Sequence, residues 1–383
     1  MASLPSPGPD ALAHSESLRR LILEDIVRQE GWIPFSRYME LALYAPGLGY
    51  YAAGARKFGA EGDFVTAPEI SPLFGRVVAR QAVEIMALST PLITELGAGS
   101  GKLAVDILLE LERLGSLPDR YCILDLSAEL RERQRALLQA RAPHLLDRVA
   151  WLDTLPDTLD GVVLGNEVLD AMPVHLVRWG EDDIYERGVA AEGQSFAWHD
   201  RPVQTPGLLE AARLIRVPEG YQSEISLSAR GLARSLSERL RRGVALFVDY
   251  GFGAGEYYHP QRSRGTLMCH YRHHVHDDPF FLVGLQDITS HVDFTAIMDS
   301  AAEGGAHLLG YTTQAHFLMN AGIVDLLRET SPENARSYLP LSSQLQKLTS
   351  PAEMGELFKV IALGKGVEAP LSGFARGDLS RLL

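Results

Sequence analysis

A glycine-rich segment, Glu95-Leu-Gly97-Ala-Gly99-Ser-Gly101, is the feature that most constrains the fold of this chain. It lies between a short β-like run over residues 92–96 and a segment with helical spacing of apolar residues over 103–114. Doubly wound α/β sheets bind nucleotides at such a strand–glycine–helix turn, at the carboxyl edge of the sheet. The glycines permit a tight turn and close approach of the backbone to a ligand.

The spacing of the glycines separates three known nucleotide-binding patterns. A phosphate-binding P-loop requires Gly, four residues, then Gly-Lys-Ser/Thr, but Leu96 stands at the first of these positions and Leu103 at the last. The dinucleotide pattern G-x-G-x-x-G would require glycine where Lys102 stands. The remaining pattern, acid-x-G-x-G-x-G with Glu95 as the acid, is that of S-adenosylmethionine (SAM)-dependent methyltransferases. A plain glycine-rich strand–helix turn is the alternative.

A second acid supports the cofactor hypothesis. A strand is predicted over residues 121–126, and Asp125 lies at its tip. A carboxylate at the tip of the second strand can accept both ribose hydroxyls of an adenosine. The alternative is that Asp125 caps the next helix, because aspartate is a preferred N-cap residue.

Strands and helices alternate along the chain, which predicts an α/β fold with a Rossmann-like, doubly wound parallel sheet covered by helices. Residues 174–217 interrupt the alternation with three strand-like runs separated by polar turns. We therefore predict N-terminal helices and an inserted accessory region. The expected parts are a disordered lead-in (1–16), a helical region with a Gly-rich loop (17–90), the core (91–175 and 243–365), an inserted substrate or accessory region (176–242) and a C-terminal tail (366–383).

The fourth predicted strand ends in Asn166-Glu167-Val-Leu-Asp170, where the transferred group would meet its acceptor. If a helical turn begins here, Glu167 and Asp170 share a face and can grip a guanidinium or ammonium group. Asn166 could bind an amine or orient the methionine part of the cofactor. An Asx-turn with two solvated acids is the alternative.

Composition limits the partners. The formal net charge of −13 disfavours nucleic acid, and no apolar run reaches the ~20 residues of a membrane helix. The N-terminus has neither a secretory signal nor an arginine-rich presequence, which predicts a cytoplasmic protein of bacterial type.

Residues 269–278 are rich in histidine, but Arg272 would repel a cation, and we predict no metal site. Tyr271 could instead stack on a guanidinium.

Several separated motifs together resemble the MidA family of SAM-dependent methyltransferases. They are the segments 62–75, 95–101, 166–175, 248–251, 286–294 and 354–360. The resemblance implies a class I methyltransferase fold, and its mitochondrial members are protein-arginine methyltransferases that modify a subunit of respiratory complex I during assembly. It also implies that SAM binds at Gly97, Gly99, Gly101 and Asp125, that Asp63, Phe64 and Thr66 lie near the cofactor and acceptor pocket, and that Asn166, Glu167 and Asp170 form the reaction centre.

The main hypothesis is therefore SAM-dependent methylation of a protein arginine, such as one in a complex I subunit. The family usually has glutamate at the position of Asp125. The resemblance also favours a homodimer. The alternatives are a methyltransferase of small molecules and a non-catalytic assembly chaperone that keeps the fold.

Overall fold

The computed structural model describes residues 4–52 and 65–383, and the chain forms two compact units. Unit 1 contains Met1–Phe64, Asp170–Gly231 and Ala254–His291. Unit 2 contains Val65–Leu169, Leu232–Gly253 and Val292–Leu383. Helix α8 (Leu227–Arg239) includes the point at which the chain passes from unit 1 to unit 2.

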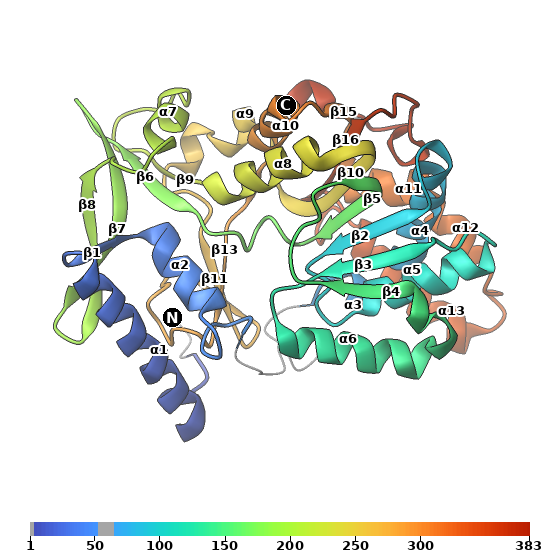
Figure 1. Cartoon of the computed structure of the whole chain (residues 1–383), viewed down its shortest axis with the longest axis horizontal. Helices are drawn as coiled ribbons and strands as arrows, with labels where there is room; N and C mark the ends of the chain where they lie inside the picture. The colour runs from blue at the N-terminus through green and yellow to red at the C-terminus, as the bar shows by residue number, and fades with distance from the viewer. Residues whose placement is uncertain (1–3, 53–64) are drawn as a thin grey trace. The chain divides into compact units, whose positions relative to one another are not determined.

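Unit 2 is built on an eight-stranded sheet in the order β15-β16-β10-β5-β2-β3-β4, with β14 paired to β10 (Figure 1). The neighbouring strands from β4 to β10 pair in parallel, and β16 runs antiparallel between β10 and β15. This is the predicted α/β fold, and the strands predicted over residues 92–96 and 121–126 lie within two residues of their predicted bounds. The strands are β2 (Leu92–Leu96), β3 (Arg120–Leu124), β4 (Val149–Leu152), β5 (Leu159–Asn166), β10 (Leu240–Phe252), β14 (Val292–Asp293), β15 (His307–Thr313) and β16 (Phe358–Lys365).

The helices of unit 2 alternate with these strands. Ser71 is the N-cap of α4, since its Oγ accepts the backbone N–H of Leu73 at 3.2 Å. Residues 314–328 form two helices rather than one, because Gly322 adopts a left-handed φ of 90° between them. The helices are α3 (Ala67–Ile70), α4 (Pro72–Leu88), α5 (Lys102–Arg113), α6 (Ala128–Arg141), α10 (Phe294–Glu303), α11 (Gln314–Asn320), α12 (Ile323–Arg328) and α13 (Ala335–Thr349), with 3₁₀ turns at Pro143–Arg148, Ser372–Phe374 and Ser380–Leu382.

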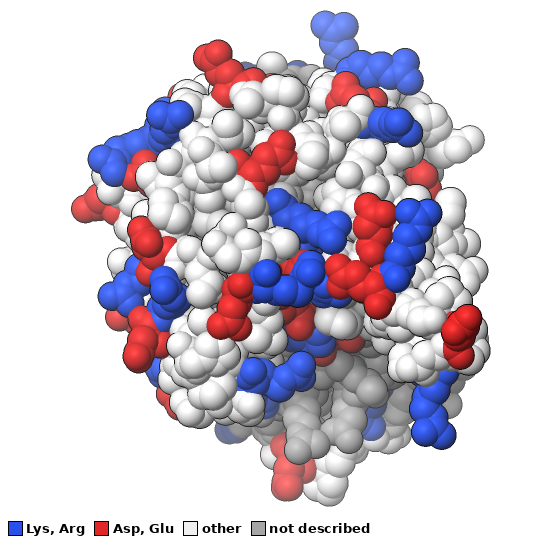
Figure 2. Space-filling view, turned by 90° about the vertical axis from the view of Figure 1, so that its right-hand side faces the viewer, with Lys and Arg blue, Asp and Glu red and all other residues white. Residues whose placement is uncertain are grey.

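An ion cluster joins three helices of unit 2. Glu110 on α5 is almost fully buried and accepts hydrogen bonds from Arg76 on α4 at 2.8 Å and from Arg113 at 2.6 Å. Arg76 also contacts Glu329, the C-cap residue of α12, at 2.6 Å. Figure 2 shows basic and acidic side chains interspersed over a face of the molecule, as such pairing requires.

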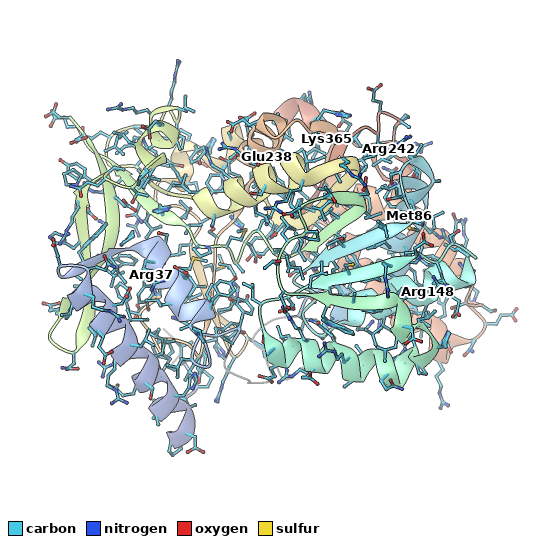
Figure 3. The ribbon with its side chains drawn as sticks, in the orientation of Figure 1. Arg37, Met86, Arg148, Glu238, Arg242 and Lys365 are labelled. Carbon is cyan, nitrogen blue, oxygen red and sulfur yellow. The ribbon has the colours of Figure 1, made fainter. Side chains whose placement is uncertain are left out.

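Two basic side chains hold strand ends of unit 2 by hydrogen bonds to backbone carbonyls. Lys365 Nζ donates to the carbonyls of Ser237 at 2.7 Å and Gly304 at 3.1 Å. Arg242 Nε donates to the Leu88 carbonyl at 2.9 Å (Figure 3). The segment after β16 was predicted to be a frayed tail, but Leu371 is buried in the core, so part of it packs on the unit.

Unit 1 begins with α1 (Pro9–Arg28), β1 (Trp32–Pro34) and α2 (Phe35–Tyr44). These helices agree with the predicted helical region near the N-terminus. Helix α1 starts at Pro9, however, inside the segment predicted to be a disordered lead-in, because proline is favoured in the first helical turn and the helix buries an apolar stripe of Leu18, Ile22 and Ile26. Arg37 on α2 donates to Asp25 on α1 at 3.0 Å (Figure 3).

The interruption at residues 174–217 forms an antiparallel sheet in unit 1, as the three predicted strand-like runs indicate. Its order is β1-β7-β6-β9, with β8 paired to β7. The sheet packs under α2, and a second small core lies beneath α7. The elements are β6 (His175–Trp179), β7 (Ile184–Glu192), β8 (Ser195–Pro202), α7 (Leu208–Arg213) and β9 (Gln222–Ile225).

The histidine-rich segment, residues 269–278, lies in regular structure. It forms a three-stranded sheet in the order β12-β11-β13. Arg272 and His273 both have positive φ, 47° and 62°, as a tight hairpin turn requires. The elements are α9 (Ala254–Tyr257), a 3₁₀ turn at Pro260–Arg262, β11 (Met268–Tyr271), β12 (His274–His276) and β13 (Asp287–Thr289). Over residues 4–52 and 65–383, no helix is both long and apolar enough to cross a membrane.

Candidate active site

The glycine turn of unit 2 has the geometry that its sequence predicts. Gly97, Gly99 and Gly101 all have left-handed φ angles, 60°, 53° and 83°. A Cβ at Gly101 would lie 3.0 Å from Cγ and 3.1 Å from Cα of Gln134. Gly101 is also the N-cap of α5, so the first backbone N–H groups of that helix point toward the turn. Only glycine fits this close, left-handed path.

Asp125 follows β3 and is held by hydrogen bonds on both carboxylate oxygens. Oδ1 accepts the N–H of Ser127 at 3.0 Å, and Oδ2 accepts Nε2 of Gln134 at 2.9 Å. Burial raises the pKa of Asp125, while the bonds from Ser127 and Gln134 lower it; burial prevails. The N-cap of α6 is Ser127, whose Oγ accepts the N–H of Leu130, so Asp125 is not the helix cap.

Glu95, the acid of the motif, is buried in β2 rather than presented at the surface of the turn. It is 2% exposed and accepts a hydrogen bond from the hydroxyl of Tyr121 at 2.8 Å. Burial raises the pKa of Glu95 to about 7, partly opposed by the Tyr121 hydrogen bond. Its observed contacts therefore support β2 and β3 beneath the glycine turn.

Leu126 and Gln134 lie at the site but were not predicted from the sequence. Leu126 directly follows Asp125 and is 80% exposed, an unusual position for a large apolar side chain beside a site. The position of Leu126 directly after Asp125, at the end of a predicted strand, is the sequence feature that could have indicated it. Gln134 joins Asp125 to the Gly99 carbonyl at 3.0 Å and accepts Nε1 of Trp151 at 2.8 Å. No local sequence pattern predicts these contacts of Gln134.

The end of β5 carries Asn166 and a strained Glu167. Glu167 has φ of 53°, a left-handed angle that is rare for a residue with a side chain. Its N–H donates to the Val248 carbonyl at 2.8 Å, and Oε1 accepts Asn166 Nδ2 at 3.0 Å and the N–H of Ala67 at 3.3 Å. The helical turn considered for residues 167–170 is absent, because Glu167 leaves helical geometry at once.

Asn166 and Asp249 complete this edge of the sheet. Asn166 Oδ1 is buried and has no hydrogen-bond partner in the described part of the chain. Asp249 on β10 is 1% exposed, and its Oδ2 accepts the N–H of Leu169 at 2.9 Å. Asp249 thus fixes the chain just after Glu167, a role that the sequence analysis did not assign. Thr66 precedes Ala67 and is the N-cap of α3 without a side-chain cap bond.

The other candidate residues fall in unit 1 or outside the described residues. Asp170, the first residue of its segment of unit 1, is 3% exposed, and its carbonyl accepts the N–H of Ser290 at 3.1 Å. Tyr271 is buried, packs edge-on against Phe281 and has the chain's own Arg272 5.3 Å from its ring centroid. Asp63 and Phe64 lie outside the described residues.

The described part of the chain contains no cluster of side chains arranged as a metal site. Within residues 4–52 and 65–383, no group of three or more His, Cys, Asp or Glu side chains is placed to hold a metal ion. His274 and His276 lie on β12 of the hairpin, and Cys269 is a buried residue of β11 whose pKa is raised by burial. Burial lowers the pKa of His276, because it favours the neutral imidazole just as it favours the neutral thiol.

These features fit a nucleoside cofactor without phosphates. The left-handed glycine turn provides backbone donors, the carboxylate of Asp125 stands at the tip of the second core strand, and Leu126 offers an apolar surface beside it. The buried Asn166 Oδ1 leaves an acceptor for an amine at the neighbouring strand end. A mainly parallel sheet that carries such a site at its strand ends is typical of a class I SAM-dependent methyltransferase.

A protein-family model described as "Putative S-adenosyl-L-methionine-dependent methyltransferase" matches residues 77–312. The chain belongs to this family of SAM-dependent methyltransferases, and the resemblance predicted from its motifs is confirmed.

Curated relatives extend over nearly the whole chain. "Protein arginine methyltransferase NDUFAF7 homolog, mitochondrial" from Drosophila melanogaster is 30% identical over 97% of this chain and 92% of the relative. "Protein arginine methyltransferase NDUFAF7, mitochondrial" from Homo sapiens is 30% identical over 90% of this chain and 82% of the relative.

Two solved structures from Burkholderia thailandensis are more similar. Each is 52% identical and covers 100% of both chains, with TM-scores of 0.96 and 0.93. The first is bound to S-adenosyl-homocysteine, the demethylated product of SAM. The class I fold and SAM as the cofactor of this family are therefore confirmed.

Proposed function

We propose that this protein transfers the methyl group of SAM to an arginine side chain of a protein. The observation that carries the proposal is Glu167, a carboxylate in a left-handed conformation at the end of β5, oriented by Asn166 and the N–H of Ala67. Backbone strain of this kind persists at functional sites because the surroundings enforce it. The names of the curated relatives support arginine as the acceptor.

The glycine turn and Asp125 are the residues we propose to hold SAM. Gly97, Gly99 and Gly101 would allow close backbone approach, Asp125 would accept the ribose hydroxyls, and the exposed Leu126 would pack against the adenine. Glu95 and Thr66 complete the proposed cofactor set, Glu95 by supporting the turn from β2. When bound, SAM supplies a methyl group activated by its sulfonium.

Asn166, Glu167 and Asp170 are the proposed acceptor residues. An arginine guanidinium stays protonated because its pKa exceeds ~12, and its nitrogen lone pair is delocalised. A carboxylate that accepts hydrogen bonds from one side of the guanidinium polarises it and receives the proton released when the nitrogen gains a methyl group. Asn166 Oδ1 would orient an amine. Asp63, Phe64 and Tyr271 are proposed to contact the substrate.

The acceptor would be a protein such as a respiratory complex I subunit, in the cytoplasm of a bacterial-type cell, with the inserted region 176–242 serving as the accessory or substrate-binding part. The names of the mitochondrial relatives support a protein acceptor. The resemblance stated above supports a homodimer.

The test is transfer of labelled methyl groups from SAM to extracts of cells lacking this protein, followed by mass spectrometry of the labelled residues. Wild-type protein should label arginine, and Glu167→Gln should reduce transfer at least about a hundredfold while SAM binding persists, because the proton acceptor is lost. Glu132→Gln, on the exposed surface of α6, is the matched control.

Other outcomes identify the alternatives. Labelling of only small molecules would favour a small-molecule methyltransferase. Rescue of a null strain by Glu167→Gln protein that binds SAM but transfers nothing would favour a non-catalytic assembly chaperone.

A further inference from the structure

A pair of stacked tyrosines in unit 1 connects two segments that carry buried acids. The rings of Tyr44 and Tyr51 lie 5.5 Å apart at an interplanar angle of 25°. The Tyr44 hydroxyl donates to the Ala171 carbonyl at 2.9 Å, next to Asp170. The Tyr51 hydroxyl lies 2.9 Å from both carboxylate oxygens of Asp287. Each tyrosine therefore fixes one of the two acid-bearing segments.

The two acidic segments also contact each other directly. The N–H of Ser290, which follows β13, donates to the Asp170 carbonyl at 3.1 Å. Asp170 is 3% exposed and Asp287 is 2% exposed. Burial is the main cause that raises the pKa of Tyr51 well above its usual range. Electrostatic repulsion from Asp287, Tyr44 and Asp170 adds to this effect, so the Tyr51 hydroxyl remains a protonated donor.

Thr289 adds an independent polar group to this cluster. It lies two residues after Asp287 on β13, so both side chains point from the same face of the strand, whereas Ile288 packs into the apolar core on the other face. Thr289 is 2% exposed, and its Oγ1 has no hydrogen-bond partner within residues 4–52 and 65–383. A buried hydroxyl without a partner indicates a place where a ligand can form a hydrogen bond.

We propose that Asp287, Thr289 and Tyr51, together with Asp170, form a subsite for a guanidinium group. A guanidinium is planar and offers five N–H donors, so it can pair with buried carboxylates and a hydroxyl at once. Tyrosine rings add a favourable face for a cation. This inference rests on the proposed methylation of arginine. It adds Asp287, Thr289 and Tyr51, which were not predicted from the sequence, to Asp170, which was.

The subsite can be tested by binding as well as by turnover. The probe is N-acetyl-L-arginine amide, titrated by calorimetry into full-length protein saturated with S-adenosyl-homocysteine, beside the lysine analogue. Loss of a hydrogen bond to a charged group weakens binding by about ten- to a hundredfold. We expect a loss of about a hundredfold for Asp287→Asn and about tenfold for Tyr51→Phe and Thr289→Val, with unchanged S-adenosyl-homocysteine affinity.

Tyr38→Phe is the matched control. It removes another buried hydroxyl of unit 1, which donates to the Pro279 carbonyl at 2.7 Å, and it should bind the probe as wild type does. In methyl transfer to an arginine peptide, Tyr51→Phe and Thr289→Val should raise KM and leave kcat within about twofold. A residue with a merely structural role would not produce that split.

The outcomes separate this inference from the proposed function. If wild type binds the arginine probe through these residues but transfers no methyl group to arginine, the subsite stands and the proposed function fails. If wild type does not bind the probe, or if folded Asp287→Asn and Thr289→Val proteins bind it as tightly as wild type, the subsite is overturned whatever the acceptor.

Discussion

Gln134 donates a hydrogen bond to Asp125 at 2.9 Å, and the same amide nitrogen lies 3.0 Å from the Gly99 carbonyl. One buried side chain of α6 thereby connects the tip of β3 to the glycine turn after β2. The proposed ribose carboxylate and the proposed cofactor turn are thus held in register by a residue that is not expected to touch the cofactor.

Replacing Gln134 by leucine should weaken SAM binding. The substitution keeps a side chain of similar volume but removes the hydrogen bonds of Gln134 with Asp125, Gly99 and Trp151, so the turn and Asp125 lose their common anchor. We expect about a tenfold increase in the Kd for SAM by calorimetry, in line with the loss of one or two buried hydrogen bonds. Gln139→Leu, on the exposed side of the same helix, should bind SAM as wild type does. Equal affinities in the two variants would contradict the anchoring role.

Gly101→Ala should lower both stability and cofactor affinity. A Cβ at this position meets Gln134, and the φ of 83° is unfavourable for alanine, which costs about 1–2 kcal/mol of unfolding free energy. Gly115→Ala is the matched control, since Gly115 also has a left-handed φ, 66°, but open space around it. Both variants should melt earlier in thermal scans, but only Gly101→Ala should lose SAM binding.

Glu95 should make the protein less stable as the pH rises through neutrality. Its pKa is raised from 4.5 to about 7 by burial, so the folded state favours the protonated acid. That contribution is fully present below pH ~4.5 and is lost as the pH rises through about 7, up to about 3 kcal/mol in all.

Glu95→Gln removes this titration and can still accept the Tyr121 hydroxyl. Denaturant unfolding without cofactor should therefore show a flatter pH profile between pH ~4.5 and ~8, with the variant more stable than wild type above pH ~7. A variant profile parallel to that of wild type would show that Glu95 does not titrate in this range.

Glu110→Ala should destabilise unit 2 strongly. Burial alone would raise the pKa of Glu110, but hydrogen bonds from Arg113 and Arg76 outweigh it and lower that pKa. Removing the carboxylate takes the buried partner from two partly exposed arginines that keep their contacts with Glu329, a loss of about 1–3 kcal/mol. Glu112→Ala, which removes an exposed pair with His144, should cost less than ~1 kcal/mol. Chemical denaturation of both variants measures the difference, and similar losses would contradict a special role for the buried cluster.

Local patterns in the sequence predicted much of unit 2. Apolar periodicity located β2 and α5 within one or two residues, because strand and helix spacing depend on neighbouring residues in the chain. The left-handed turn at Gly97, Gly99 and Gly101 was predictable because glycine alone adopts that backbone freely. The resemblance of several motifs then led to the methyltransferase family and to SAM.

Only the tertiary structure decided which distant side chains meet. The bond of Gln134 to Asp125, the hold of Asp249 on Leu169, and the meeting of Tyr51 with Asp287 join residues from 9 to 236 positions apart. It also decided the left-handed geometry of Glu167, which its neighbours Ala67 and Val248 enforce. Periodicity and motif spacing describe each segment by itself, whereas these contacts depend on how buried polar groups find partners once the segments pack.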